Sequence, residues 1–326
     1  MDAAKLEEVL RVFDKALSQI KWRLKPSSKS RLQTDILALC SRMRPCIMVD
    51  YGGKMPELGN NLCAFLEHCK KESSICKLLH VLVVDDMVYL VEARALADFV
   101  KSSLETAVLF VDLETDPPKM MTQAEESPAM VQLLSAQKLF SSVFHTDGVN
   151  GDHFQRRETQ NIGSSLDGPA VFESPVMVDL SHCLQESDVT IPTLNGWLLG
   201  YPVVYLFGKD HIERAVYNLS SKSLHIYQIF VTRSNSSSKG NRKEELMSFT
   251  VPYDLSLEGS NEPWAKSFLA ALKERWEKCK HIWGSLHMEK IGRVSVTIYS
   301  CNRYDNLDFL NCLLHLPRLA TYWRSK

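Results

Sequence analysis

The sequence lacks an apolar run long enough to span a membrane. The longest such stretch, from Trp197 to Phe207, is about half of the roughly 20 residues that a membrane-spanning helix needs, and Gly200 and Pro202 interrupt it. The first residues, MDAAKLEEVLRVFDKAL, carry charges at every turn and have no apolar core of the kind a secretory signal requires. We therefore expect a soluble protein of the cytoplasm or nucleus, with no membrane partner.

Neither sign of charge is in excess. The 38 Lys and Arg residues stand against 39 Asp and Glu residues, which gives a formal net charge of -1. Such a balance provides no global field to attract nucleic acid, so we expect no nucleic-acid partner. With 326 residues, of which 45 % are hydrophobic, the chain can bury a sizeable core as one large domain or about two smaller ones.

The nine cysteines include no CxxC pair. An odd number of cysteines without a secretory signal is typical of reduced, buried thiols in an intracellular protein. The closest group, Cys63, Cys69 and Cys76, has spacings of six and seven residues, which match no zinc template. No cysteine has basic neighbours in the sequence that would mark it as a nucleophile, although a histidine brought close by the fold could still activate one.

The first part of the chain alternates helical and strand patterns. Apolar residues at spacings of three and four predict helices at 6–20, 27–43, 56–71, 93–104 and 127–143. Short β-branched runs predict strands at 46–51, 79–84, 87–92 and 107–114. Because only Asp85 and Asp86 separate two of these strands, they should form a hairpin, since a parallel crossover needs about a dozen residues.

The second part is richer in strand patterns. PVVYLF, SLHIYQIFVTR, LMSFTVPYD and RVSVTIYS predict an antiparallel sheet, with an exposed polar loop from Ser234 to Glu245. A helix that begins near Pro263 carries Trp264, Phe268, Leu272, Trp276, Cys279 and Trp283 almost every fourth residue. The aromatic stripe could stack bases or seat a partner helix, but packing on the sheet is the simpler interpretation.

These patterns predict an α/β or α+β fold, with a mixed N-terminal layer and a C-terminal antiparallel sheet covered by the Trp-rich helix. A Gly-, Asn- and Ser-rich stretch suggests a boundary, so we expect an N-terminal half at 1–145, a polar linker or loop at 146–175 and a C-terminal half at 176–326. The two halves could pack as a single domain.

Aspartates at the ends of predicted strands are the first candidates for chemistry. Asp50 is followed by Gly52 and Gly53, whose backbone could approach a phosphate or carboxylate, and Asp112 could lie nearby if the two strands adjoin. Two close carboxylates would bind a divalent cation or raise the pKa of one of them. The alternative is that both aspartates cap ordinary turns, since no Walker lysine and no GxGxxG motif completes a site.

A second candidate is a metal site in the predicted linker. His145, Asp147, Asp152 and His153 place four ligands that suit zinc or iron within nine residues. The surrounding Gly-rich sequence is a poor source of the rigid hydrogen bonds that orient metal ligands.

Four segments resemble a known family. CIMVDYGG, LHVLVVDDMVYLVE, LNGWLLGYPVVYLF and LMSFTVPYDLS, in this order, are similar to an uncharacterised eukaryotic family typified by a human chromosome 1 open-reading-frame product. The resemblance implies an intracellular protein and supplies no activity, cofactor or catalytic residue.

Two functional hypotheses follow. The first is an interaction or adaptor protein without catalytic activity, which would bind a protein partner, because two polar loops are present and no catalytic constellation is complete. The second is a metal-assisted hydrolase or nucleotide-handling enzyme. In that enzyme Asp50 would be the metal ligand or general base, Asp112 its partner, and Gly52 and Gly53 the backbone cradle of the substrate.

Overall fold

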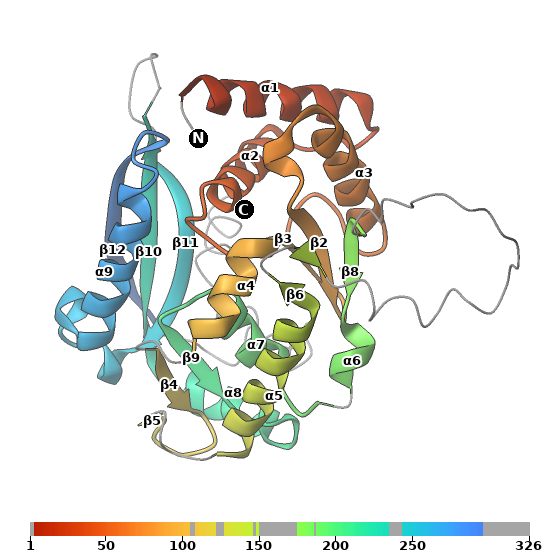
Figure 1. The fold of residues 1–326 in the computed structure, drawn as a ribbon. Coiled ribbons are helices and arrows are strands. Elements are labelled where there is room, and N and C mark those ends of the chain that lie inside the picture. The colour runs from red at the N-terminus through yellow and green to blue at the C-terminus, as the bar shows by residue number, and fades with distance from the viewer. Residues whose placement is uncertain are drawn as a thin grey trace, which may run out of the picture.

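The computed structural model has a mixed α/β architecture (Figure 1). The residues that it describes are 3–104, 108–121, 127–145, 148–149, 175–185, 187–234 and 243–295. Among them are mostly antiparallel sheets with helices packed between and around them, which confirms the predicted fold class.

The first sheet has the strand order β1-β3-β2-β8. Its strands are β1 (Cys46–Met48), β2 (Leu79–Val84), β3 (Met87–Glu92) and β8 (Met177–Asp179). The hairpin of β2 and β3 turns at Asp85, which has a φ of 50°, so the predicted hairpin is confirmed. Every residue of β2 is buried, which explains its uninterrupted apolar sequence.

Helices from the first part of the chain surround this sheet. They are α1 (Ala3–Gln19), α2 (Pro26–Cys40), α3 (Glu57–Glu72), α4 (Ala93–Ser102) and α5 (Pro128–Val143). Helix α1 packs on α3 and α3 packs on β2, while α4 contacts both β3 and α5. The side chain of Glu92 accepts the N–H of Ala95 and so caps α4, and Ser127 caps α5 in the same way.

A second sheet, of order β5-β4-β9, joins the two parts of the chain. Its strands are β4 (Leu109–Asp112), β5 (Lys119–Met121) and β9 (Val203–Leu206). The prediction that PVVYLF belongs to the C-terminal sheet is wrong, because β9 pairs in parallel with β4. The short helix α7 (Ile191–Leu198) packs against β9 and places it there.

Strands from beyond residue 175 thus pair with strands from before it, in both sheets: β8 with β2, and β9 with β4. Buried side chains from both parts belong to one contiguous core. The division into halves at 146–175 stays a prediction. The remaining short elements are α6 (Ser181–Gln185), α8 (Ile212–Ser220), β6 (Phe144–His145) and β7 (Gly148–Val149).

The third sheet is the antiparallel C-terminal one, and α9 (Pro263–Glu277) covers it (Figure 1). Its order is β11-β10-β12, from β10 (Ser223–Arg233), β11 (Lys243–Pro252) and β12 (Trp283–Ser295). The Trp264 ring meets Tyr227 edge-on, with centroids 5.3 Å apart, and Phe268 meets Phe249 at 5.8 Å. Trp264 and Phe268 of α9 therefore serve the core, as predicted.

Three predicted boundaries in this region are wrong. Helix α9 ends at Glu277, and Trp283 is the first residue of β12. The N–H of Trp283 still bonds to the carbonyl of Cys279, 3.1 Å away, so the turn continues the fourfold spacing that the helix began. Strand β12 consequently starts ten residues before the predicted 293, and Lys243 to Glu245 lie in β11 rather than in a loop.

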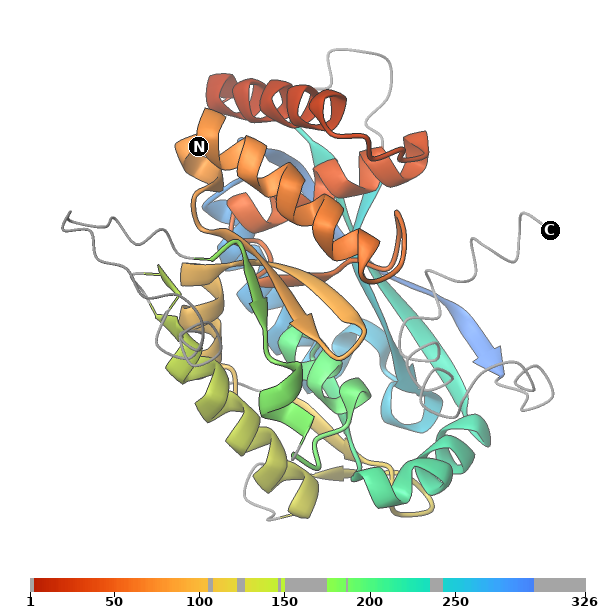
Figure 2. The ribbon, with the colours of Figure 1, turned by 90° about the vertical axis from the view of Figure 1, so that its right-hand side faces the viewer.

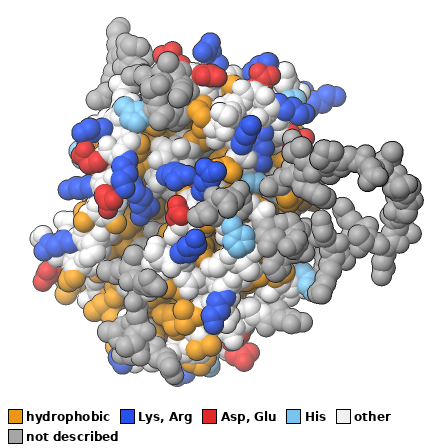
Figure 3. All heavy atoms as spheres, viewed as in Figure 1, with side chains coloured by type: hydrophobic (Ala, Val, Ile, Leu, Met, Phe, Trp, Pro, Cys, Tyr) orange, Lys and Arg blue, Asp and Glu red, His pale blue; other side chains and the backbone are white. Residues whose placement is uncertain are grey.

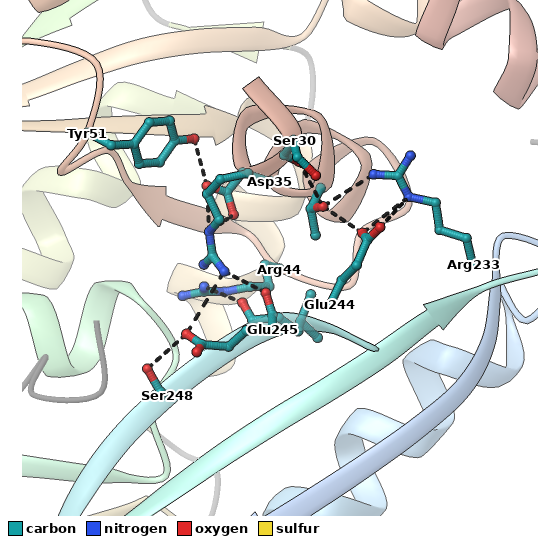
Figure 4. A network of polar contacts seen from close by, with 11 residues as sticks. Ser30, Asp35, Arg44, Tyr51, Arg233, Glu244, Glu245 and Ser248 are labelled. Carbon is teal, nitrogen blue, oxygen red and sulfur yellow. Dashed lines mark hydrogen bonds and ion pairs between the residues drawn. The ribbon is translucent and has the colours of Figure 1, made fainter. Parts of the chain in front are cut away.

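A polar network joins α2 to β11 (Figure 4). Asp35, which is 1 % exposed, accepts hydrogen bonds from Arg31 Nε at 3.2 Å and from the Tyr51 hydroxyl at 2.8 Å. Arg31 also donates from Nη1 to the carbonyl of Glu245 at 2.6 Å. These bonds connect the first sheet with the third through a buried carboxylate.

Arg44 makes a second connection in the same place. It is 1 % exposed, and its guanidinium donates to the carbonyls of Leu246 at 3.0 Å and Leu199 at 3.2 Å. The register of β10 with β11 shifts here, because Ile229 faces Met247 while Phe230 faces Glu245. Leu246 is therefore the extra residue of a β-bulge, and its carbonyl is available to Arg44.

Candidate ligand-binding cleft

A cleft of about 740 Å³ lies where these parts of the fold meet. Its walls come from the end of α2 and the loop to β1, from α4, from the turn between α7 and β9, and from the end of α9 with the following turn. No single sheet or helix forms it, so the cleft exists only in the assembled fold.

The floor of the cleft is apolar and aromatic. Trp197 is 1 % exposed, and its indole N–H donates to the Ser103 hydroxyl at 2.8 Å, which fixes the ring. Phe99 packs on Trp197 with a centroid distance of 6.2 Å. Gly200 has a φ of 68°, a left-handed conformation that lets the chain turn directly after α7 and place Tyr201 in the wall.

The rim carries basic side chains. Lys and Arg gather on the face of the molecule that shows α4 and α9 (Figure 3). Four of the residues that line the cleft are basic: Arg42, Arg275, Lys278 and His281. Among the same lining residues, Asp98 alone is acidic. The cleft is therefore electropositive and would favour an anion over an apolar floor.

Arg42 occupies an unusual backbone position. Its φ is 57°, and its N–H bonds to the carbonyl of Leu39 at 2.9 Å, so it is the left-handed residue that ends α2. Glycine is the usual residue there. The Arg42 side chain is 52 % exposed, and its nearest carboxylates, those of Glu92 and Asp98, are 3.9 and 4.0 Å away. Such loose ion pairs leave most donors of the guanidinium accessible.

Arg275, near the end of α9, lines the same cleft as Arg42. Its Nη1 donates to the carbonyl of Met43 at 3.2 Å, which anchors the end of α9 to the α2–β1 loop. Burial lowers the pKa of Arg275, but an arginine stays protonated at neutral pH. Lys278, three residues on and therefore on the same side of the helix, pairs with Glu274 at 2.8 Å.

Two thiols line the cleft, Cys40 and Cys279. Burial raises the pKa of Cys279 to about 11. The pKa of Cys40 is also raised, first by its hydrogen bond with the Cys76 thiol and then by burial. Both are therefore protonated at neutral pH and are weak nucleophiles. The cleft is better suited to non-covalent binding than to covalent catalysis.

The predicted aspartates lie elsewhere. Asp50 is exposed just beyond β1, in the first sheet, whereas Asp112 ends β4 in the second. The carboxylate of Asp112 accepts the N–H of Glu114 at 2.7 Å, as in a turn. Neither residue lines the cleft, and their joint role in a catalytic site stays a prediction.

Gly52 and Gly53 do adopt positive φ angles, of 85° and 145°. A Cβ on Gly52 would come within 2.7 Å of Leu24, and the Gly52 carbonyl accepts the indole N–H of Trp22 at 2.7 Å. Close packing beneath Trp22 is thus one reason for glycine at position 52. A role in cradling a ligand stays a prediction.

His145 ends β6 and is exposed. Asp147, Asp152 and His153 lie outside the described residues, so the predicted zinc or iron site stays a prediction. Within the part of the chain that the structure describes, no group of three or more His, Cys, Asp or Glu side chains is arranged to hold a metal ion.

The sequence patterns did not predict the cleft. Two signals point to it in retrospect: an arginine directly after a helix end, where glycine is usual, and the spacing of three between Arg275 and Lys278. Neither signal shows that α4 and α9, which are far apart in the chain, line the same cleft.

Fold and cleft together define a mixed α/β protein with a basic cleft at the junction of its sheets. The chain belongs to the family described as Domain of unknown function (DUF4504), whose family model matches residues 14–298. This match confirms the resemblance to a family without an assigned activity, while the narrower link to a chromosome 1 open-reading-frame product stays a prediction. Searches of curated proteins and of solved structures find no match.

None of the helices in the described part of the chain combines the length and the apolar character needed to cross a bilayer.

Proposed function

We propose that this chain is a binding protein whose cleft holds a small organic anion with an apolar or aromatic part. The observation that carries the proposal is the combination of an apolar floor with a basic rim in one cleft of about 740 Å³. Small-molecule sites are usually clefts of about 300 to 1,000 Å³, lined by apolar groups with a few polar groups that fix orientation.

The two parts of such a ligand have distinct contacts. The apolar part would lie on Phe99 and Trp197, and the acidic group would lie between Arg42 and Arg275. A hydrogen bond to a charged group contributes about 1.5 to 3 kcal/mol, so each arginine can change affinity by about tenfold or more.

The proposal belongs to the class of interaction proteins favoured by the sequence. The acidic group could belong to a free small molecule or to a peptide segment of a protein partner, and the experiment distinguishes the two. The rival hydrolase or nucleotide-handling hypothesis rests on Asp50 and Asp112, which lie outside the cleft.

The test uses a matched pair of fluorescent probes with the purified full-length protein. Anilinonaphthalenesulfonate carries an aromatic body and an anionic group, and phenylnaphthylamine is a neutral analogue. We expect saturable binding of the sulfonate that weakens about tenfold in Arg275→Gln, while binding of the neutral probe changes little. Lys273→Gln, on the same helix but outside the cleft lining, is the matched control and should bind both probes normally.

Equal loss of both probes in Arg275→Gln, or sulfonate binding that Arg275→Gln and Arg42→Gly leave unchanged, would overturn the proposal. Competition against the bound sulfonate then distinguishes the natural occupants: nucleotides, aromatic carboxylates, and an acidic peptide with its amidated counterpart. A stabilisation by a divalent metal that Asp50→Asn abolishes would instead support the rival hydrolase.

A further inference from the structure

A short basic connector, residues 20–25, joins α1 at the top of Figure 2 to α2. The exposure of its side chains alternates along the chain. The cationic side chains are exposed: Lys21, Arg23 and Lys25. The apolar side chains between them are buried or half-buried against the core: Trp22 and Leu24. A period of two is typical of an extended segment, so three cations project from one side of the connector.

The two inward side chains fix the connector on the loop that follows β1. The indole N–H of Trp22 donates to the carbonyl of Gly52 at 2.7 Å. A Cβ on Gly52 would come within 2.7 Å of Leu24 and 2.9 Å of Trp22, so both side chains pack closely on this residue. The backbone that carries the cations is therefore ordered before any partner arrives, which lowers the entropic cost of binding.

The cations of the connector differ from neighbouring lysines in their pairing. Lys15 pairs with the carboxylate of Glu72 at 2.8 Å, and Lys29 pairs with that of Asp14 at 3.0 Å. Within the described part of the chain, none of the ion pairs involves a cation of the connector. The sequence from residue 15 to residue 31 also contains no Asp or Glu. The connector thus carries a local excess of positive charge in a chain whose net charge is -1.

The backbone of the connector can also receive a partner. Among the described residues, the N–H and C=O groups of residues 21–24 form no hydrogen bond with other backbone groups. An extended segment with unpaired backbone groups can pair with a strand of another chain. Opposite side chains in such a pair lie about 5 Å apart, and every second residue faces the same side, about 6 to 7 Å further along. Acidic residues at alternate positions of a partner strand would therefore meet Lys21, Arg23 and Lys25 in register.

We propose that the basic connector docks an extended acidic segment of a partner protein, with Asp or Glu at alternate positions. The proposal is independent of the cleft and of its ligand. Two features favour a peptide over other anionic partners. The aromatic ring of the connector, Trp22, faces inward and leaves no ring for the base stacking that single-stranded nucleic acid uses. The three cations also fall short of the cluster of about four to eight that recruits an anionic membrane.

The test compares two fluorescein-labelled peptides by fluorescence anisotropy with the full-length protein at low salt. Both consist of Glu and Thr, with the same length and the same number of glutamates. The in-register peptide has its glutamates at every second position, and the control peptide has them at every third. A spacing of three places successive glutamates on opposite sides of a strand. We expect the in-register peptide to bind about threefold or more tightly than the control peptide.

Variants then assign the binding to the connector. Replacing Lys21, Arg23 and Lys25 together by Gln should weaken binding of the in-register peptide about tenfold and abolish its advantage, because each exposed ion pair contributes up to about fivefold. The matched control variant replaces three exposed lysines outside the connector by Gln: Lys15, Lys71 and Lys77. It changes the net charge equally and should retain the preference for the in-register peptide.

Equal affinity for the two peptides, or an equal loss of binding in the two triple variants, would overturn the proposal. Tighter binding of an oligothymidylate or of phosphatidylserine vesicles, abolished by the triple change in the connector, would also overturn it and identify nucleic acid or a membrane as the partner. Thermal unfolding of both triple variants should match that of the unchanged protein, since the substituted side chains are exposed. A loss of binding then reports a lost contact rather than misfolding.

Discussion

Arg42 and Arg44 are two residues apart, but they belong to different parts of the molecule. Arg44 is 1 % exposed and its guanidinium bonds to two backbone carbonyls, those of Leu246 and Leu199. The Arg42 side chain is 52 % exposed, with its nearest carboxylates 3.9 and 4.0 Å away. The comparison distinguishes an arginine whose partners are supplied by the fold from one whose donors are accessible to a ligand.

The same contrast holds between Arg31 and Arg275. Arg31 donates to the buried carboxylate of Asp35 and to the carbonyl of Glu245, so the α2–β11 junction holds it from two sides. The Arg275 guanidinium donates to the carbonyl of Met43 and otherwise borders the cleft. The following changes test whether these two groups of arginines act separately on stability and on binding.

The largest expected effect is a loss of stability in Arg44→Ala. We expect the free energy of unfolding to fall by about 4 kcal/mol, because two buried carbonyls lose their donor and a cavity remains. Urea denaturation measures this loss. Arg214→Ala, at an exposed position of α8, should unfold like the unchanged protein. A loss below about 1 kcal/mol for Arg44→Ala would show that water can replace the guanidinium.

Asp35→Asn should destabilise somewhat less. The substitution retains an acceptor for the Tyr51 hydroxyl but leaves the Arg31 charge without its buried partner, so we expect a loss of about 3 kcal/mol. Urea denaturation at low and high salt checks it, because a buried pair is screened little. A loss that disappears in high salt would contradict the burial of this pair.

Arg275→Gln should reduce ligand binding much more than it reduces stability. Its stability should fall by only about 1 kcal/mol, for the lost bond to the Met43 carbonyl, while sulfonate affinity falls about tenfold. Titration at several salt concentrations adds a second criterion, since the wild-type affinity should decrease with ionic strength. Lys273→Gln is the charge-matched control. A stability loss as large as that of Arg44→Ala would place Arg275 among the structural arginines.

The smallest change in stability should come from Arg42→Gly. Glycine relieves the left-handed strain at this position, which is worth about 1 kcal/mol and is partly offset by its greater freedom in the unfolded chain. Thermal unfolding should therefore be unchanged or slightly raised, while binding of anilinonaphthalenesulfonate weakens. Arg42→Asn, which also tolerates this backbone conformation, should behave alike. An Arg42→Gly protein that loses stability but binds the sulfonate normally would show that Arg42 stabilises the fold and does not bind the ligand.

Local features were predictable where one short segment contains all the information. The hairpin of β2 and β3 follows from two strand patterns joined by two residues, a length that permits only antiparallel pairing. The start of α5 follows from Ser127 and Pro128, which provide a cap and a preset first turn. The core role of Trp264 and Phe268 likewise follows from helical spacing.

Errors arose where a pattern does not specify its partner. The strand PVVYLF is recognisable as β9, but its apolar sequence does not indicate pairing with β4 rather than with the C-terminal sheet. Trp283 continues the spacing of α9 through the turn at Cys279, so periodicity alone placed it on the helix. Asp50 and Asp112 follow strands of two different sheets, and their joint catalytic role stays a prediction.

The sequence by itself determined the fold class, the hairpin, most helix starts and the aromatic face of α9, because turn residues, caps and hydrophobic spacing act over a few residues. The tertiary structure alone decided the cleft. Arg42 and Arg275 line it together only because α2 packs against both β3 of the first sheet and β11 of the third. Such contacts depend on how burial of the whole apolar surface is best satisfied, and that is not encoded in any single segment.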